Sequence, residues 1–334
     1  MALFVLLSIE VGILDNYRRL LGHGQGKPPT PEWSSAMPQR TPDLEILKAG
    51  GIIKQRQEDF FLVRLKVTLG ELTSDQLAAI GDIARQYGRG KIHITIRQGI
   101  EIPWVRWADV QAVTDRLAEI GIPLGACGPR IRVVVACQGD DVCPHALAST
   151  RSLGLALDSR FYGQSGVPHK LKMGVTGCPN ACAKPQEHDI GFMAVALPEL
   201  ADEELCISCG LCAEGCRAKA IELVEGKPVF DLNRCYRDGE CISRCPTAAV
   251  SAARTGWNLF VGGKWGREPR MGQLFEEFLT EEEALDRVES IVAVWKQLAL
   301  PGERLGKLID RIGIDAFRQE LTAASKSRNG YRRP

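Results

Sequence analysis

The distribution of apolar and polar residues predicts an α/β unit in the first half of the chain. The run FFLVRLKV at 60–67 is typical of a strand, and residues 73–88 have the apolar periodicity of a helix. The segment KIHITIR at 91–97 alternates strictly between polar residues and isoleucine, which predicts another strand. A second helix is expected at about 107–120. The order β-α-β-α predicts a ferredoxin-like α+β sandwich.

The first helix and the second strand of this unit carry clear local signals. Thr73 and Gln76 have the spacing of a capping box, and Gly88 ends the apolar periodicity. The apolar face of the helix consists of Leu77, Ile80, Ile83 and Ala84. The strand places isoleucines on one face, and its polar face consists of Lys91, His93, Thr95 and Arg97. Such a polar face is ordinarily exposed to solvent.

Apolar runs also predict elements in the second half of the chain. IRVVVA at 131–136 and HKLKMGV at 169–175 are typical of strands. Two amphipathic helices are expected at 281–299 and 303–321, with a Pro-Gly turn between them. The basic segment 321–334 is expected to be a disordered tail.

The first 42 residues have a different character. The apolar run at 1–14 is interrupted by Glu10 and lacks a positive leading segment, so it predicts a packed helix rather than a signal peptide or a membrane span. Eight glycine and proline residues lie between positions 22 and 42. That composition is typical of a linker or an extended arm.

Composition narrows the class of protein. The chain has 334 residues, 45% of them hydrophobic and 25% charged, which allows two or three ordinary globular domains. The formal net charge is only +1, so nothing indicates binding to nucleic acid or to an anionic membrane, and any affinity for anions must be local. Twelve cysteines without a convincing secretory signal favour metal binding over disulfides and indicate the cytoplasm.

Four cysteines in two pairs form the most informative part of the sequence. Cys137 and Cys143 follow the first of the two later strands, and Cys178 and Cys182 follow the second. Each pair lies beside glycine or proline, and four such thiolates are able to bind one iron–sulfur cluster. Structural zinc and disulfides are the alternatives. Zinc sites favour closer cysteine pairs than the five-residue gap in the first pair.

Basic residues lie on the two strands that precede these cysteines. Arg130 and Arg132 are two positions apart, as are Lys170 and Lys172, so each pair shares one face of its strand. One such pair would be an ordinary solvated face. Two pairs that lead into cysteine motifs favour a site for a small oxyanion, because arginine presents a planar fork and lysine supplies charge and a proton.

A second set of cysteines forms an internal duplication that resembles a bacterial two-cluster ferredoxin. The first repeat, CISCGLCAEGC, contains Cys206, Cys209, Cys212 and Cys216. A shift of 29 residues superimposes these on Cys235, Asp238, Cys241 and Cys245. Asp238 thus replaces a cysteine, and Arg217 replaces the usual proline. Since each repeat takes its fourth ligand from the other, one site should use Cys206, Cys209, Cys212 and Cys245, and the other Cys216, Cys235, Asp238 and Cys241. The alternative is that the second site is vestigial and empty.

These motifs, together with TGCPN around Cys178 and the segment GKIHITIRQGIEIP, resemble the sirohaem-dependent sulfite and nitrite reductases over roughly residues 55–320. The arrangement is most similar to the catalytic subunit of anaerobic sulfite reductase and to dissimilatory sulfite reductase subunits. The resemblance implies an arm and linker at 1–54, a ferredoxin-like half-domain at 55–125, a sirohaem and [4Fe-4S] catalytic domain at 126–199 and 252–320, an inserted two-cluster ferredoxin domain at 200–251 and a basic tail at 321–334.

The resemblance also implies roles for individual residues. A [4Fe-4S] cluster coupled to sirohaem would be held by Cys137, Cys143, Cys178 and Cys182, the last of which would also bind the sirohaem iron through its sulfur. The substrate oxyanion would be held and protonated by Arg97, Arg132, Lys170 and Lys172. Sirohaem carries eight carboxylates, and the cations expected to bind them are Arg130, Lys264, Arg267 and Arg270. A basic surface loop is the alternative for the last three.

The implied activity is the six-electron reduction of sulfite to sulfide. Electrons would pass through one ferredoxin-type [4Fe-4S] cluster and a second one that is [4Fe-4S] or [3Fe-4S]. Nitrite reduction to ammonia and a non-catalytic electron-transfer subunit without sirohaem are the alternatives. Expected partners are an electron-donor protein with iron–sulfur or flavin groups, and a second copy or a related subunit, because assimilatory relatives carry two such units in one chain. No glycine-rich dinucleotide fingerprint is present.

Overall fold

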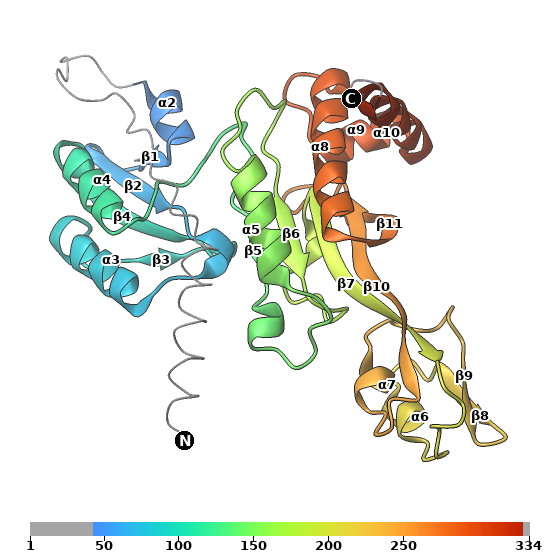
Figure 1. Cartoon of the computed structure of the whole chain (residues 1–334). Helices are drawn as coiled ribbons and strands as arrows, with labels where there is room; N and C mark the ends of the chain where they lie inside the picture. The colour runs from blue at the N-terminus through green and yellow to red at the C-terminus, as the bar shows by residue number, and fades with distance from the viewer. Residues whose placement is uncertain (1–42, 330–334) are drawn as a thin grey trace, which may run out of the picture. The chain divides into compact units, whose positions relative to one another are not determined.

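The computed structural model describes residues 43–329, so the expectations for the apolar run at 1–14 and the linker lie outside the described residues. An antiparallel sheet in the order β1-β2-β4-β3 forms the first unit (Figure 1). Its strands are β1 (Ile52–Lys54), β2 (Phe60–Leu65), β3 (His93–Ile94) and β4 (Ile100–Arg106). Its helices are α2 (Leu44–Ala49), α3 (Ser74–Tyr87) and α4 (Val110–Glu119). Since β1 pairs with β2, the sheet begins before the expected boundary at residue 55.

The predicted α+β arrangement is confirmed for this unit. The Thr73 side chain accepts a hydrogen bond from the Gln76 N–H at 3.1 Å, and the Gln76 side chain accepts one from the Thr73 N–H at 3.1 Å, so the capping box is present. Both helices bury apolar side chains against the sheet. The core of the unit includes Val63, Ile80, Ile83, Ile102, Val113 and Leu117.

The alternating segment 91–97 differs from the prediction. Only His93–Ile94 forms a strand, and it lies at the edge of the sheet next to β4. The isoleucines face solvent, with Ile94 74% and Ile96 92% exposed. The strand ends because a tight turn follows, in which the Thr95 N–H donates to Gly99 O at 2.8 Å. This turn redirects Arg97 toward the second unit.

A mixed five-stranded sheet in the order β11-β10-β7-β6-β5 forms the second unit. Its strands are β5 (Val135–Ala136), β6 (Met173–Thr176), β7 (Ile190–Leu200), β10 (Val250–Val261) and β11 (Gln273–Leu279). The neighbours β5, β6 and β7 are parallel, whereas β7, β10 and β11 are antiparallel. The helices are α5 (Thr150–Phe161), α8 (Glu281–Leu298), α9 (Leu305–Ile312) and α10 (Ile314–Asn329). The core between sheet and helices includes Leu153, Leu157, Phe192, Leu259, Ile291, Trp295 and Phe317.

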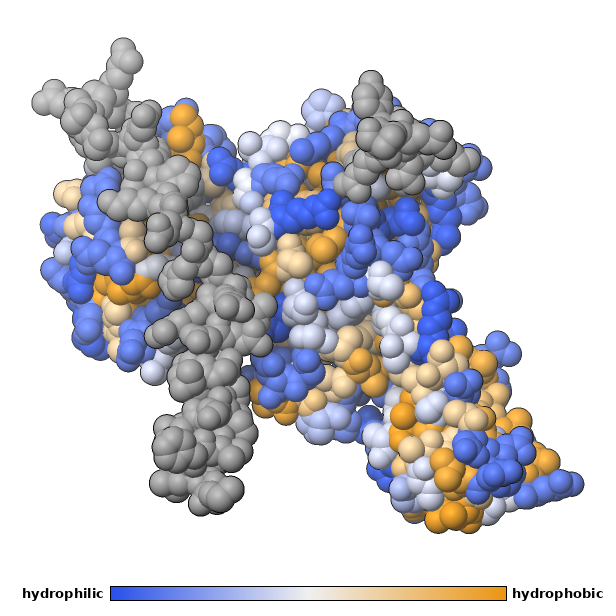
Figure 2. All heavy atoms as spheres, in the orientation of Figure 1, coloured by the Kyte–Doolittle hydropathy of each residue, from blue (hydrophilic) through white to orange (hydrophobic). Residues whose placement is uncertain are grey.

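A small body lies between the end of β7 and the start of β10. It contains the hairpin β8 (Ile221–Val224) and β9 (Lys227–Phe230) and the short helices α6 (Leu211–Gly215) and α7 (Glu240–Ser243). Its core is minimal and includes Cys212, Cys241 and Val250. In Figure 2, apolar side chains are visible on the surface of this body as well. So small an apolar core suggests that bound groups contribute to its stability.

The C-terminal segment departs from the prediction in two places. The expected helix 303–321 is interrupted at Gly313, whose φ of 86° is unfavourable for other residues, so α9 and α10 are separate helices. The expected disordered tail at 321–334 was wrong in its first part, because α10 continues to Asn329. Among residues 43–329, no helix has the length and apolar composition that a membrane span requires.

Trp295 provides a test of how α8 packs. Its side chain is fully buried, and its Nε1 donates to Glu303 O at 3.1 Å. Trp295→Ala should lower the free energy of unfolding by about 3–5 kcal/mol, because it leaves a large cavity. Lys296→Ala, at an exposed neighbouring position, should change it by less than about 0.5 kcal/mol. Urea denaturation followed by circular dichroism measures both variants. An equal loss of unfolding free energy in the two variants would contradict the buried position of Trp295.

Candidate functional site

The loops that carry the two early cysteine pairs are joined by hydrogen bonds. β5 leads directly into Cys137 and β6 leads into Cys178, and because these strands are parallel neighbours their loops emerge at the same edge of the sheet. The Gly177 N–H donates to Cys137 Sγ at 3.2 Å, and the Leu147 N–H donates to Gly177 O at 2.8 Å. The first loop therefore packs directly against the second.

We call Cys137, Cys143, Cys178 and Cys182 the four-cysteine site. Burial raises the pKa of Cys178, and the charges of the other three thiols raise it further, so all four lie near one another. All are free, and Cys182 is exposed. Within the described residues, no three Cys, His, Asp or Glu side chains gather as a single metal ion would require.

Arg97 extends from the turn after β3 toward β5. Its Nη2 donates to Val133 O at 2.8 Å, whereas its Nη1 is buried and has no hydrogen-bond partner among residues 43–329. The adjacent Gln98 side chain fixes this turn through two hydrogen bonds to the backbone of Ala136, at 2.6 and 3.1 Å. Burial lowers the pKa of Arg97 to about 10, so the guanidinium is still charged at neutral pH. A buried cation with a free N–H is suited to an anion.

Arg132, Lys170 and Lys172 complete the cation group, which we define as these three residues with Arg97. Arg132 donates to two backbone carbonyls, at 2.7 and 3.0 Å, and within the described part of the chain its buried Nε has no hydrogen-bond partner. Burial lowers the pKa of both lysines, and the charge of Arg97 helps to bring that of Lys172 to about 8. Arg130, at the start of the same run, is half-buried. A lysine with so low a pKa releases a proton readily.

Asp189 and Arg304 organise this group, and the sequence did not indicate either. Asp189 is fully buried. It accepts hydrogen bonds from Arg304 at 2.9 and 2.7 Å and from the Lys172 N–H at 2.8 Å. Burial raises the pKa of Asp189, and the charge of Arg304 opposes that rise. Because the two residues are 115 positions apart, no local pattern marks them as a pair.

His188 is a further residue that the sequence did not indicate. Its side chain is buried, and Nδ1 lies 2.9 Å from Lys184 O. Burial, and next the charge of Arg97, lower its pKa to about 3, so the ring is neutral at physiological pH. It packs against Gly174 in β6, where a Cβ would lie only 2.8 Å from the imidazole. His188 thus fills space beside the cation group and adds no charge.

The three later cations of the sequence prediction lie in the loop between β10 and β11. Lys264 and Arg270 face each other across a β-bridge. Lys264 Nζ lies 3.2 Å from Glu268, and Arg270 Nε lies 2.8 Å from Asp310. Arg267 is exposed. Two of these three cations are therefore already paired with carboxylates within the chain.

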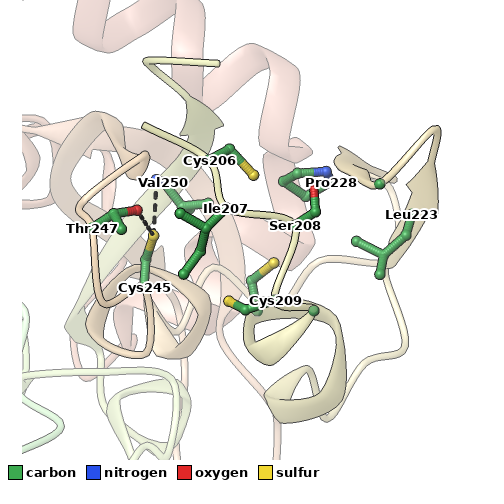
Figure 3. Close-up of a pocket in the computed structure, with 12 residues that line it drawn as sticks. Cys206, Ile207, Ser208, Cys209, Leu223, Pro228, Cys245, Thr247 and Val250 are labelled. Atoms are coloured by element: carbon green, nitrogen blue, oxygen red, sulfur yellow. Dashed lines mark hydrogen bonds between the residues drawn. The ribbon is translucent and has the colours of Figure 1, made fainter. Parts of the chain in front are cut away.

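The first ferredoxin-type site is a hollow of about 330 Å³, open to solvent (Figure 3). The cysteines in its lining are Cys206, Cys209, Cys212 and Cys245. Cys245 Sγ accepts a hydrogen bond from the Val250 N–H at 3.4 Å and lies 3.7 Å from Thr247 Oγ1. Hydrogen bonds of this kind to sulfur tune the reduction potential of iron–sulfur clusters.

The second ferredoxin-type site is a hollow of about 280 Å³. Its lining includes Cys216, Cys235, Asp238 and Cys241. Burial raises the pKa of Cys241 to about 12, and the other three side chains add to that rise. The N–H groups of Ala220 and Arg237 each donate to a cysteine sulfur at 3.3 Å. The structure thus brings together the two sets of side chains that the duplicated motif predicts.

The backbone of the small body repeats with the same interval as its cysteines. Helices α6 and α7 each follow a glycine with positive φ. Positive φ values recur in three pairs 29 positions apart: Ser208 and Arg237, Gly210 and Gly239, and Lys219 and Ala248. Left-handed conformations at non-glycine residues are uncommon, so the two matched non-glycine pairs, together with the glycine pair, indicate that both repeats share one fold.

Two parts of the chain match family models of known proteins. Residues 53–120 match the family model of the nitrite/sulfite reductase ferredoxin-like half domain, and residues 127–328 that of the nitrite and sulphite reductase 4Fe-4S domain. The chain is 33% identical to the coenzyme F420-dependent sulfite reductase of Methanocaldococcus jannaschii over 83% of its own length, but spans only 44% of that protein.

One subunit of the anaerobic sulfite reductase of Salmonella typhimurium is similar in length. It is 31% identical over 84% of this chain and 89% of its own sequence. The crystal structure of dissimilatory sulfite reductase I superimposes with a TM-score of 0.66 at 20% identity, covering 79% of this chain and 69% of that one, and so supports the fold. Because one family model covers more than half of the sequence, the chain belongs to the nitrite and sulfite reductase family.

Proposed function

We propose that this chain is the catalytic subunit of a sulfite reductase and reduces sulfite to sulfide with six electrons. The two relatives described above are both named sulfite reductases. The observation that carries the proposal is the cation group, in which Arg97 Nη1 and Arg132 Nε are buried and unpartnered. Two such cations would be costly without an anionic ligand, and a small oxyanion would offset their charge.

Sirohaem is the group that we propose beside the cation group. When bound, it supplies an iron for the sulfur of sulfite and a ring that carries electrons. The four-cysteine site would hold the coupled [4Fe-4S] cluster, with Cys182 also ligating the sirohaem iron. The donor set fits, because Arg132 precedes β5, the two lysines precede β6, and the cysteines follow both strands. Arg97 and Arg132 also each have one buried N–H without a partner among the described residues. The cations proposed for the sirohaem carboxylates are Arg130, Lys264, Arg267 and Arg270.

The four residues of the cation group would have two roles toward the oxyanion, binding it and protonating it. Arg97 and Arg132 would hold sulfite oxygens through their free N–H groups. Lys170 and Lys172 would donate protons as each oxygen leaves as water, and the lowered pKa of Lys172 suits it to that role. Fixed cations also stabilise negative charge that grows during reduction. Asp189 would keep Lys172 in place through the backbone N–H.

Two other functions predict different results in turnover assays. Reduction of nitrite to ammonia would use the same site, so turnover of both anions with reduced methyl viologen should be compared. We expect a higher kcat/KM with sulfite. A non-catalytic electron-transfer protein would turn over neither anion. The buried, unpartnered cations favour an enzyme, since an electron carrier has no need of them.

The small body would act as a two-cluster ferredoxin domain inserted into the catalytic domain. We propose a [4Fe-4S] cluster in the first ferredoxin-type site. The second would hold a [4Fe-4S] or [3Fe-4S] cluster, because the Asp238 oxygen is a harder ligand than sulfur and binds one iron less firmly. The strands β7 and β10, which end at Leu200 and begin at Val250, support insertion boundaries near 200–251.

We further propose that the chain pairs with a second copy or a related subunit, and that it works in the cytoplasm. The exposed isoleucines beside the edge strand β3 are suited to such a contact, because an edge strand with apolar side chains favours association. Twelve free cysteines fit a reducing compartment. The electron donor would be a protein with flavin or iron–sulfur groups.

Lys172→Ala should lower sulfite turnover by about 10²-fold or more, because it removes a proton donor. Absorption spectrum and iron content should stay unchanged, which separates lost chemistry from lost cofactor. Lys91→Ala, at an exposed position, serves as the control and should retain full turnover. Steady-state assays with sulfite measure both variants. Near-normal turnover in Lys172→Ala would remove this lysine from the mechanism.

The pH dependence of turnover should follow the same lysine. With a pKa of about 8, Lys172 is protonated below pH 8 and loses its proton above it, so turnover should fall about tenfold per pH unit beyond that point. Lys172→Arg keeps its charge throughout this range. Its turnover should be lower but flat across the same interval. A fall that persists unchanged in Lys172→Arg would assign the titration to another group.

Asp238→Cys tests the second ferredoxin-type site. The oxidised wild-type protein should show a three-iron signal in low-temperature EPR, and Asp238→Cys should lose that signal because a fourth thiolate retains the fourth iron. Asp231→Cys, an exposed acid of the same body, should leave the signal intact. The absence of any third cluster after anaerobic purification would contradict a working second site.

A further inference from the structure

Apolar side chains surround the first ferredoxin-type site and face solvent. Ile207 is 63% exposed, Leu211 38% and Leu223 45%. Ile207 and Leu223 also line the hollow, and Figure 3 shows both beside the cysteines. We call these three residues the outer patch. In Figure 2 the body that carries α6, β8 and β9 shows apolar surface interspersed with charged surface.

The backbone that carries Ile207 and Leu223 is held in place by contacts between the hairpin and the cysteine loop. The β8–β9 turn packs on the cysteine loop so closely that a Cβ at Gly226 would lie 2.8 Å from Ser208 Oγ. Lys227 of β9 donates to Cys206 O at 3.0 Å and also to Glu203 O. The hairpin and the loop therefore form one rigid surface around the hollow, and the side chains of the patch lose little freedom when a partner covers them.

The two ferredoxin-type sites differ in what lies next to them. Beside the second site, Glu240 lies 3.7 Å from His145, and a Cβ at Gly239 would lie 2.7 Å from Leu147. His145 and Leu147 follow Cys143 in the loop of the four-cysteine site. The second site thus adjoins the catalytic unit, whereas the first has the exposed Cys209 at its rim. A protein could approach the first site from solvent at this rim.

Carboxylates border the outer patch. Between residues 201 and 227 the chain has six carboxylates and only three cations. The exposed acids are Asp202, Glu203, Glu204, Glu214, Glu222 and Glu225. Lys227, the cation nearest the hollow, is occupied by backbone carbonyls. The rim is therefore mostly negative, although the exposed Arg217 and Lys219 also belong to this segment. An apolar centre with a rim of predominantly one sign is the arrangement by which interfaces gain contact area and electrostatic steering.

We propose that the outer patch is the docking surface for an electron-donor protein whose own contact surface is apolar and ringed by lysine and arginine. The inference rests on the proposed function, because the first ferredoxin-type site must hold a cluster. The step transfers one electron: the donor's reduced flavin or iron–sulfur centre is oxidised, and the cluster in this site is reduced. No atom is transferred. Attraction between the acids around the outer patch and the basic residues of the donor would speed association. Salt would weaken this attraction by screening the charges.

Ferric cytochrome c is a suitable probe, because it is a one-electron acceptor with a lysine-ringed contact surface. The anaerobically purified holoenzyme would be reduced, freed of reductant and mixed with cytochrome c in a stopped-flow instrument. The rate of cytochrome reduction should fall about tenfold or more between about 20 and 200 mM salt. The triple variant E204K/E222K/E225K should be about tenfold slower at low salt and nearly insensitive to salt.

Glu119→Lys is the matched control, since it makes the same charge change at an exposed position in α4. It should behave as the wild type. Iron content, EPR signals and sulfite turnover with reduced methyl viologen are measured for every variant. Loss of those signals in the wild type would overturn the proposed function. Intact signals with a rate that ignores salt, rises with it, or falls equally in Glu119→Lys would overturn the docking surface alone.

Discussion

One buried carboxylate holds together a group of cations that would otherwise repel one another. Asp189 accepts two hydrogen bonds from Arg304 and one from the backbone of Lys172. Its charge raises the pKa of Lys172, whereas burial and the charges of Arg97, Arg304 and Lys170 lower it. One negative charge does not balance so many positive ones in a partly desolvated site. The remaining positive charge is the physical basis for binding an anion.

The sheet of the second unit places the cations and the cysteines at opposite ends of the same two strands. Parallel β5 and β6 have the cations at one end and the cysteines at the other, separated by about four residues or roughly 13 Å of strand. The long strands β7 and β10 pair from Ile190–Val261 to Leu200–Val250 and carry the small body at their far ends. The Ala196 N–H donates to Arg237 O at 3.0 Å, which fixes that body to the sheet. In the proposed function, these two strands would connect the electron supply to the catalytic unit.

Sequence reasoning was most successful where chemistry is encoded at fixed spacing. The interval of 29 residues predicted both groupings of side chains in the small body, and the capping box at Thr73 predicted the start of α3. Sequence reasoning was less successful where contacts between residues far apart in the chain determine the local structure. The alternation at 91–97 suggested a regular strand, but a turn at Thr95 ends it and leaves Ile94 and Ile96 exposed. Asp189 and Arg304 meet across 115 positions, and no local pattern predicts such a pair.

The absorption spectrum of the anaerobically purified protein tests the central claim most directly. If sirohaem binds beside the cation group, the spectrum should show a Soret band and a band in the red. Both should shift when sulfite is added, because the anion would bind at the iron among those cations. A spectrum with only the broad absorption of iron–sulfur clusters, unchanged by sulfite, would contradict the account and indicate an electron-transfer protein.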